Sequence, residues 1–294
     1  MKKILMTGAT GFIGRNILPI LRSYFDTKLL EYGEQTSIVS PTRNELDITN
    51  KQNVDQYLEN NSFDILLHFA ESDPSHNPLD KTEKRFDNMV RAFLHFESHA
   101  GKFKKVIYTG SGAEYNKAYD IKMSAEEEIG NTIPKDDYGF AKYILNTIAR
   151  KSENIYNMRL FGCYGPTDPQ KKFITDAINS CLNGQAITIK QDCYFDYLYV
   201  ADFAKIICWF IDNTPKYHDY NITTGNPFKL SSIAKIVADK MNNKKPIKIL
   251  KSGLNNEYTA SNKRLITEIG DFDFTTLSEG ISKQAAIQCA PSIT

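Results

Sequence analysis

Residues 1–16 read MKKILMTGATGFIGRN, and this stretch decides the fold. A short apolar run ends at Thr7, and Gly8, Gly11 and Gly14 follow at the spacing G-x-x-G-x-x-G. Apolar residues then recur at helical intervals, so the pattern predicts a strand, a tight turn and a helix. Such glycines let the backbone approach a pyrophosphate, and the helix N-terminus offers free N–H groups to its phosphates. The stretch therefore predicts a dinucleotide-binding turn.

Length and composition exclude several classes of protein. The chain has 294 residues, 41% hydrophobic and 24% charged, which is ordinary for one large α/β domain or two units sharing a core. Its net charge is +1 without a basic block, so we expect no nucleic-acid or membrane-surface partner. No apolar stretch approaches the roughly 18 residues of a membrane span, and an N-terminal strand leaves no room for a signal peptide. The five cysteines, odd in number and without a C-x-x-C, fit a reduced cytoplasmic enzyme.

Apolar runs alternate with helical patterns through the first half of the chain. The expected strands are Ser37–Ser40, Asp64–Phe69, Lys105–Thr109 and Asn157–Leu160, and the expected helices are Lys51–Asn60, Thr82–Ala100 and Tyr138–Lys151. This alternation predicts βαβ units and a doubly wound parallel sheet with right-handed crossovers. Residues 25–36, FDTKLLEYGEQT, fit no pattern clearly.

The pattern loosens after Gly165-Pro166. Here we expect helices at Phe173–Leu182, Val200–Ile211 and Leu230–Met241, short strands at Ala186–Ile189, Asp196–Leu198 and Tyr220–Ile222, and Ile247–Leu250 as a last strand. We therefore predict an α/β fold with a nucleotide-binding domain in residues 1–165, joined by a returning segment near 193–222. Residues 166–294 form mainly a smaller mixed α/β cap over the carboxyl edge of the sheet, where such folds bind ligands.

Tyr138 and Lys142 lie four residues apart at the start of an expected helix, so both project from one face. A phenol has a reference pKa of about 10, and a neighbouring ammonium favours the phenolate and lowers that pKa. Ser111, at the end of an expected strand, adds a hydroxyl that can hold a carbonyl oxygen. The three residues are therefore candidates for acid–base catalysis at a carbonyl group.

The chain resembles the extended short-chain dehydrogenases/reductases, the NAD(P)-dependent nucleotide-sugar epimerases, dehydratases and reductases. The resemblance rests on TGATGFIG at 7–14, LDI at 46–48, HFA at 68–70, Ser111 to Tyr115, Tyr138-x-x-x-Lys142 and RLFGCYGP at 159–166. It implies a Rossmann-type domain with NAD(P), a cap that binds a nucleoside-diphosphate sugar, and a homodimer formed through two sheet-flanking helices. In pattern the chain is most similar to GDP-fucose synthase-like reductases of 4-keto sugars.

Single positions distinguish the branches of this family. Dehydratases carry Asp-Glu after the catalytic hydroxyl residue, whereas this chain has Gly112-Ala113, so dehydration is not expected. GDP-fucose synthases epimerise with a cysteine and a cap histidine; here Ala113 takes the first position, and Lys172 or Phe173 the second. Because Ala113 cannot move a proton, the resemblance implies plain hydride transfer.

Cofactor choice depends on the end of the second strand. VSPTRNEL has no acid there to bind an NAD ribose, and it places Arg43 where NADP-using relatives hold an arginine. We therefore expect NADP(H), with NAD(H) possible. The remaining expected cofactor contacts are the turn residues Gly8, Thr10, Gly11, Phe12, Ile13 and Gly14, then Asp47 and Ile48 at the adenine, and Phe69, Ala70, Lys142 and Leu160.

Two departures leave the substrate open. Gly162 stands where relatives often have a substrate-contacting Asn, and Phe195 where many grip the diphosphate with Arg. Either another cation serves the diphosphate, with Lys172, Lys190 and Arg264 as the candidates, or the contact to the diphosphate is weaker. The remaining expected substrate contacts are Ser72, Gly112, Ala113, Phe173 and Gln191. No metal site is expected, since His95 and His99 lack a third ligand.

The leading hypothesis is an NADPH-dependent reductase of a nucleotide-linked 4-keto-6-deoxy sugar or heptose, in the synthesis of surface polysaccharide precursors. The alternatives are an epimerase that keeps NAD bound, a bifunctional epimerase–reductase, and a dinucleotide-sensing protein without turnover. The residues leave the nucleotide, the sugar and the product stereochemistry open.

Overall fold

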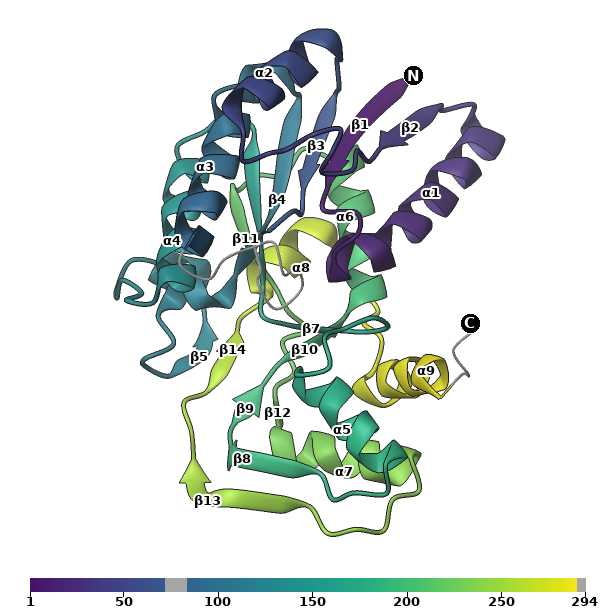
Figure 1. Cartoon of the computed structure of the whole chain (residues 1–294), viewed down its shortest axis with the longest axis vertical. Helices are drawn as coiled ribbons and strands as arrows, with labels where there is room; N and C mark the ends of the chain where they lie inside the picture. Colours follow the sequence, from purple (N-terminus) through teal and green to yellow (C-terminus); the bar gives the residue numbers. More distant parts are fainter. Residues whose placement is uncertain (72–83, 290–294) are drawn as a thin grey trace.

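The computed structural model describes residues 1–71 and 84–289. Its centre is a six-stranded parallel sheet in the order β11-β6-β4-β3-β1-β2 (Figure 1). The strands are β1 (Lys2–Thr7), β2 (Thr36–Val39), β3 (Ile65–His68), β4 (Lys105–Ser111), β6 (Ile155–Leu160) and β11 (Asp219–Ile222). The chain passes from one side of β1 to the other between β2 and β3, so the ligand crevice of a doubly wound sheet is expected at the carboxyl ends of β1 and β3.

Helices cover both faces of this sheet (Figure 1). On one face lie α1 (Phe12–Tyr32) and α6 (Val200–Asp212), and on the other lie α2 (Lys51–Asn60), α3 (Arg85–Glu97) and α4 (Asp137–Ala149). Successive side chains of a strand point to opposite faces. Ile4 and Met6 therefore belong to the core under α1 and α6, whereas Leu5 belongs to the core under α2, α3 and α4. The predicted doubly wound α/β fold is confirmed.

The segment that fitted no pattern, residues 25–36, contains the last two turns of α1. Ile17, Leu21 and Phe25 form the buried stripe of this helix, and the residues after Phe25 are mostly exposed, which hid the helical period. The helix ends at Gly33, whose φ of 69° lies in the left-handed region and whose N–H donates to the Leu29 carbonyl.

The cap lies below the carboxyl edge of the sheet in Figure 1. Its core packs α5 (Phe173–Leu182), α7 (Leu230–Lys240) and α9 (Leu277–Gln288) together with β8 (Thr188–Asp192), which pairs in parallel with β13 (Lys248–Leu254). The cap also holds a four-stranded sheet of β12 (Phe228–Lys229), β9 (Tyr194–Phe195), β14 (Tyr258–Ala260) and β5 (Ile121–Ser124).

Two connections cross the expected boundary between the domains. β11 and α6 return to the central sheet, as a segment near 193–222 was expected to do, while β5 leaves the first 165 residues to pair with β14. β7 (Gly162–Tyr164) pairs with β10 (Tyr197–Tyr199) at the junction. Ile247–Leu250 is not the last strand: β14, α8 (Lys263–Ile269) and α9 follow it, and a three-residue strand such as β14 leaves no periodic signal.

In the part of the chain that the structure describes, no helix combines the length and the apolar character needed to cross a membrane.

The homodimer stays a prediction, and α3 and α4 offer a face for it. Leu94 on α3 and Phe140 on α4 are each 39% exposed, and Phe140 stacks on Phe86 with ring centroids 5.8 Å apart. We expect wild-type protein to scatter light as a particle of about twice 33.4 kDa. Leu94→Glu places a charge in the interface and should yield monomer, whereas Leu30→Glu on exposed α1 should not. A monomeric wild type at micromolar concentration would contradict the prediction.

Candidate active site

The glycine turn between β1 and α1 is closed by contacts that only glycine permits. Gly8 has a φ of 76°, and a Cβ there would lie 2.5 Å from the carbonyl carbon of Phe69. A Cβ on Gly14 would meet the carbonyl oxygen of Gly8, so the first turn of α1 packs directly on the turn. No side chain caps the N-terminus of α1 at Gly11. Its first N–H groups are therefore available to an anion.

A cavity of about 1340 Å³ opens at this turn and extends to the cap. Among its lining residues are the expected cofactor contacts Gly8, Thr10, Gly11, Phe12, Ile13, Arg43, Asp47, Ile48, Phe69, Ala70 and Leu160. Gly14 does not line the cavity; it lies behind the turn as a packing residue. The glycine turn lets the backbone approach a pyrophosphate, the uncapped helix offers N–H groups to it, and the cavity is large enough for a dinucleotide.

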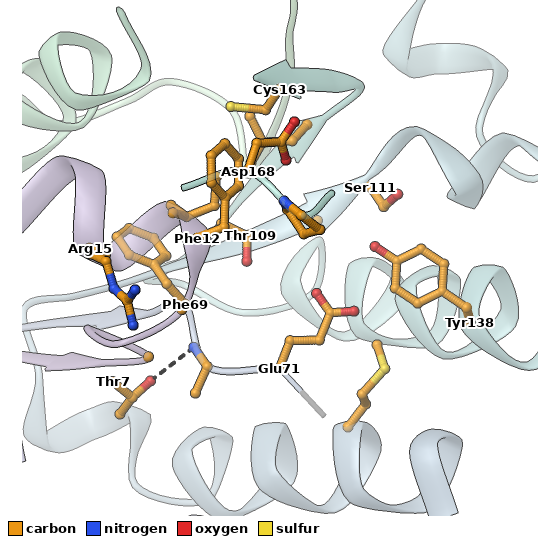
Figure 2. A pocket seen from close by; sticks show the side chains of 18 of the residues that line it. Thr7, Phe12, Arg15, Phe69, Glu71, Thr109, Ser111, Tyr138, Cys163 and Asp168 are labelled. Atoms are coloured by element: carbon orange, nitrogen blue, oxygen red, sulfur yellow. Dashed lines mark hydrogen bonds between the residues drawn. The ribbon is translucent and has the colours of Figure 1, made fainter. Parts of the chain in front are cut away.

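Ser111 and Tyr138 line the sheet end of this cavity, and Lys142, which is not among the lining residues, has its Nζ 5.9 Å from the centroid of the Tyr138 ring. Ser111 ends β4 and caps a 3₁₀ helix, Gly112–Tyr115, by accepting a hydrogen bond of 3.2 Å from the Ala113 N–H. Figure 2 shows the side chains of Ser111 and Tyr138 facing the same part of the pocket. Lys142 is buried beside them, and its Nζ donates to the Thr109 carbonyl at 2.6 Å.

The expected lowering of the Tyr138 pKa is not observed. Burial and the carboxylate of Glu71 raise the pKa of Tyr138 well above its usual range, against a smaller lowering by hydrogen bonding with Ser111. The Lys142 ammonium donates to the Thr109 carbonyl and lies 3.6 Å from Glu71 Oε2. Tyr138 is therefore a neutral phenol that carries its proton at neutral pH.

Sequence reasoning missed Glu71 and Arg85, which both line the cavity. Glu71 Oε1 accepts a hydrogen bond of 3.2 Å from Arg85 Nη2, and the Arg85 guanidinium lies 4.4 Å from the centroid of the Tyr138 ring. Glu71 directly follows the singled-out Phe69-Ala70, so its position could have been found. Arg85 could not, because only the fold brings the start of α3 to α4.

Asp168 is a second carboxyl group that the sequence did not predict. It lines the cavity from the cap side beside Cys163 (Figure 2), and it is 7% exposed. Thr175 Oγ1 donates weakly to its Oδ2 at 3.4 Å, and its Oδ1 has no hydrogen-bond partner among the described residues. Burial raises the pKa of Asp168 to about 7, although Lys172 and Thr175 lower it. The cavity thus holds an acid–base group that can change protonation near neutral pH.

This raised pKa predicts a pH-dependent loss of stability. The unfolded carboxyl has a pKa of about 3.9, so between roughly pH 4 and pH 7 the folded protein binds the proton more tightly. Stability from Asp168 is present below that window and is lost as the pH rises through it. We expect the Tm of Asp168→Asn, relative to wild type, to increase between pH 4 and pH 8 in calorimetry. Asp176→Asn, exposed on α5, serves as control, and a pH-independent difference for Asp168→Asn would contradict the raised pKa.

Three expected substrate residues line the cavity: Gly162, Lys172 and Phe195. The glycine has a structural reason, because a Cβ on Gly162 would come within 2.5 Å of the Asp196 carbonyl oxygen where β7 packs on β10. An asparagine does not fit this close approach. Ser72 lies outside the described residues.

Other expected substrate residues do not line the cavity. Gly112 and Ala113 lie buried behind Ser111, and Phe173 packs against the core of the cap. Gln191 is directed to β13, where its side-chain amide donates to the Ser252 carbonyl, and Lys190 is exposed. The sequence alone does not show which of these side chains point into the cavity and which point away from it.

The expectation that Arg264 contacts the substrate diphosphate has to be corrected. Its Nη1 donates to Asp219 Oδ1 at 2.9 Å, and its Nη2 pairs with Glu127, so it neutralises carboxylates near the edge of the central sheet. It does not line the cavity. Among the described residues, the basic side chains that line the cavity are Arg15, Arg43, Arg85, Lys117 and Lys172. Of the three proposed diphosphate cations, Lys172 is therefore the one that lines the cavity.

Among the described residues, His95, His99 and Cys163 are neither metal ligands nor nucleophiles. A ring nitrogen of His95 bonds the Ile48 carbonyl at 2.9 Å, and His99 Nε2 lies 3.3 Å from Asp55. Within residues 1–71 and 84–289, no group of three or more His, Cys, Asp or Glu side chains could hold a metal ion. Cys163 lines the cavity, but burial raises the pKa of its thiol well above the usual range, so it is a poor nucleophile.

This fold and site are those of an extended short-chain dehydrogenase/reductase. Residues 4–223 match the NAD dependent epimerase/dehydratase family, and the chain belongs to that family.

Curated relatives are similar over most of the chain. GDP-L-colitose synthase of Yersinia pseudotuberculosis is 22% identical, with 96% of each chain covered. A trifunctional UDP-glucose 4,6-dehydratase/UDP-4-keto-6-deoxy-D-glucose 3,5-epimerase/UDP-4-keto-L-rhamnose-reductase of Arabidopsis thaliana is 23% identical over 96% of this chain. The chain spans only 46% of that relative's length.

Solved structures share the fold. A GDP-L-fucose synthetase of Naegleria fowleri bound to NADP superposes with a TM-score of 0.81 at 16% identity, covering 97% of this chain and 93% of that one. The GDP-mannoheptose C4 reductase of Campylobacter jejuni with NADP bound gives a TM-score of 0.80 at 15% identity, covering 98% of both chains.

Proposed function

We propose that the protein is a cytoplasmic NADPH-dependent reductase that acts on the keto group of a nucleotide-diphosphate-linked 4-keto-6-deoxy sugar or heptose, for surface polysaccharide precursors. The observation that carries this proposal is the meeting of Ser111, a neutral Tyr138 and Lys142 at one end of a cavity that begins at the glycine turn. The names of the similar colitose synthase and heptose C4 reductase support the substrate class.

Each residue has a separate role in this proposal. When bound, the reduced nicotinamide supplies the hydride. Ser111 holds the carbonyl oxygen, and Tyr138, which keeps its proton, donates that proton to the alkoxide as it forms. Lys142 binds the nicotinamide ribose through its ammonium and stabilises the phenolate left on Tyr138. Phe195 and Lys172 line the cavity, and in this proposal they contact the nucleotide and its diphosphate.

A panel of substrates tests this proposal. Purified protein is mixed with NADPH and with GDP-, CDP-, dTDP- or UDP-linked 4-keto sugars, and loss of absorbance at the NADPH band is followed. We expect one nucleotide series to be turned over. Tightly retained NAD in the purified protein, together with no net NADPH oxidation on any member, would favour an epimerase instead. An intact site without turnover or retained NAD would favour a sensor.

A bifunctional epimerase–reductase is the second candidate, and Asp168 favours it. Ala113 cannot move a proton, but a cavity carboxyl with a pKa of about 7 can remove or return one beside a ketone. If Asp168 has this role, solvent deuterium should enter the product of the wild type, and Asp168→Asn should stop that exchange while reduction continues.

Arg43 carries the prediction of cofactor preference. It lines the cavity in the loop after β2, where Ser40 and Pro41 offer no carboxylate to an NAD ribose. We expect kcat/KM with NADPH to exceed that with NADH at least about tenfold, the worth of one charge-assisted contact. Arg43→Ala should erode the preference and spare NADH turnover, whereas Arg22→Ala on the exposed side of α1 should change neither. A wild type that prefers NADH contradicts this role.

A further inference from the structure

Tyr258 reaches the catalytic end of the cavity from a distant part of the chain. It begins β14, whose neighbours are β5 and β9, and it lines the cavity with Ser111 and Tyr138. Its ring packs between Phe161 and Phe195, with centroids 4.9 Å from each. These two contacts fix the direction of the phenol.

The hydroxyl of Tyr258 lies against the turn that follows Ser111. A Cβ on Gly112 would come within 2.6 Å of the Tyr258 hydroxyl oxygen, so the phenol occupies the space beside that glycine. Burial raises the pKa of Tyr258, and hydrogen bonding with Ser111 opposes that rise. Tyr258 therefore keeps its proton at neutral pH and can donate it in a hydrogen bond.

The hydrogen-bonding capacity of Ser111 then determines where its own proton points. A serine hydroxyl has one O–H to donate and two lone pairs to accept with. The Ala113 N–H occupies one lone pair at 3.2 Å. If the Tyr258 hydroxyl occupies the second, the Ser111 proton can point only into the cavity, toward Tyr138.

We propose that Tyr258 is a positioning residue that donates a hydrogen bond to Ser111 Oγ and so directs the Ser111 proton to the carbonyl oxygen of the substrate. This inference deepens the proposed reductase and rests on it for the substrate. The proposed contact needs no bound ligand, so it can be tested apart from turnover.

The first arm of the test is a thermal-stability cycle on the ligand-free protein. It uses the wild type, Tyr258→Phe, Ser111→Ala and the double variant. Tyr258→Phe keeps the ring between Phe161 and Phe195, so only the hydroxyl is lost. We expect it to lower the Tm by about 2–4 °C in the wild type and by less than about 1 °C in Ser111→Ala, because its partner is then absent. If Tyr258→Phe lowers the Tm equally in the wild type and in Ser111→Ala, the proposed contact is wrong. This test holds even if the protein turns over no substrate of the panel.

The second arm measures reduction with the same four proteins. Tyr258→Phe is expected to lower kcat roughly tenfold, the worth of one hydrogen bond, with KM for the sugar within about twofold. In the Ser111→Ala background it should change kcat by less than about twofold, because a residue that acts through Ser111 has nothing left to position.

The matched control is Tyr108→Phe, since the buried Tyr108 hydroxyl has no hydrogen-bond partner among the described residues and lies outside the cavity lining. It should leave kcat unchanged. A Tyr258→Phe enzyme with wild-type kcat, or one whose loss is the same with and without Ser111, would overturn the positioning role. If the wild type is active and either of these results is found, only the role of Tyr258 is rejected. If the wild type is inactive on every substrate, the proposed reductase is rejected, and the stability cycle alone tests the hydrogen bond between Tyr258 and Ser111.

Discussion

Tyr138→Phe is expected to lower the rate of reduction by about 100- to 10,000-fold, the usual cost of losing a positioned general acid. The change removes one oxygen and keeps the ring under Arg85, so the folded state and the affinity for NADPH should stay near those of the wild type. Because burial and Glu71 raise the pKa of Tyr138, the wild-type phenol holds its proton through neutral pH, as a proton donor must.

Single-turnover measurements with saturating NADPH isolate this step, and fluorescence titration reports NADPH binding separately. Tyr143→Phe is the matched control, because Tyr143 lies on the same helix outside the cavity lining. A Tyr138→Phe enzyme that keeps most of its activity, with NADPH bound normally, would show that another group donates the proton.

Lys142→Met is expected to differ in kind, because it affects cofactor binding as well as turnover. Loss of charge-assisted hydrogen bonds to the ribose should weaken NADPH binding by about 10- to 100-fold. Without the ammonium, the phenolate left after proton transfer is less stable, which raises the pKa of Tyr138 further and lowers kcat. The two losses together should reduce kcat/KM by roughly 1000-fold or more. The pH optimum should move upward.

The measurement is a pH–rate profile with NADPH affinity determined at each pH. Lys151→Met, in the exposed turn that follows the same helix, removes a lysine without touching the cavity and should match the wild type. Normal NADPH affinity in Lys142→Met would contradict the ribose contact. An unchanged pH optimum would contradict the electrostatic role at Tyr138.

Local signals explain what could be predicted from the sequence. The bounds of α2 and α5 agree with those expected, since each has a strong apolar stripe and α2 begins after Asn50, whose side chain accepts from the Asn53 N–H. The glycine turn was equally accessible, because its spacing specifies both the strand before it and the helix after it. The Tyr138 to Lys142 interval placed both residues on one side of α4.

Features that depend on distant segments were missed. Tyr258 sits in a three-residue strand that exists only because β5 and β9 flank it. Arg264 was assigned to the substrate because a free cation was sought, yet its partner Asp219 is 45 residues away in sequence. The pKa of Tyr138 was predicted with the wrong sign because burial and the Glu71 carboxylate raise it, and Glu71, which follows β3, meets Tyr138 only in the folded chain.

The central claim is net hydride transfer to a sugar ketone, and NMR of the product made in deuterated water tests it most directly. With unlabelled NADPH and the nucleotide 4-keto sugar that the panel identifies, we expect carbon 4 of the product to carry hydrogen from NADPH. If hydride transfer is the whole reaction, carbons 3 and 5 should carry no deuterium beyond that of substrate incubated alone. Enzyme-dependent deuterium at carbon 3 or carbon 5 would contradict the plain reductase, and its loss in Asp168→Asn would assign Asp168 the epimerising role.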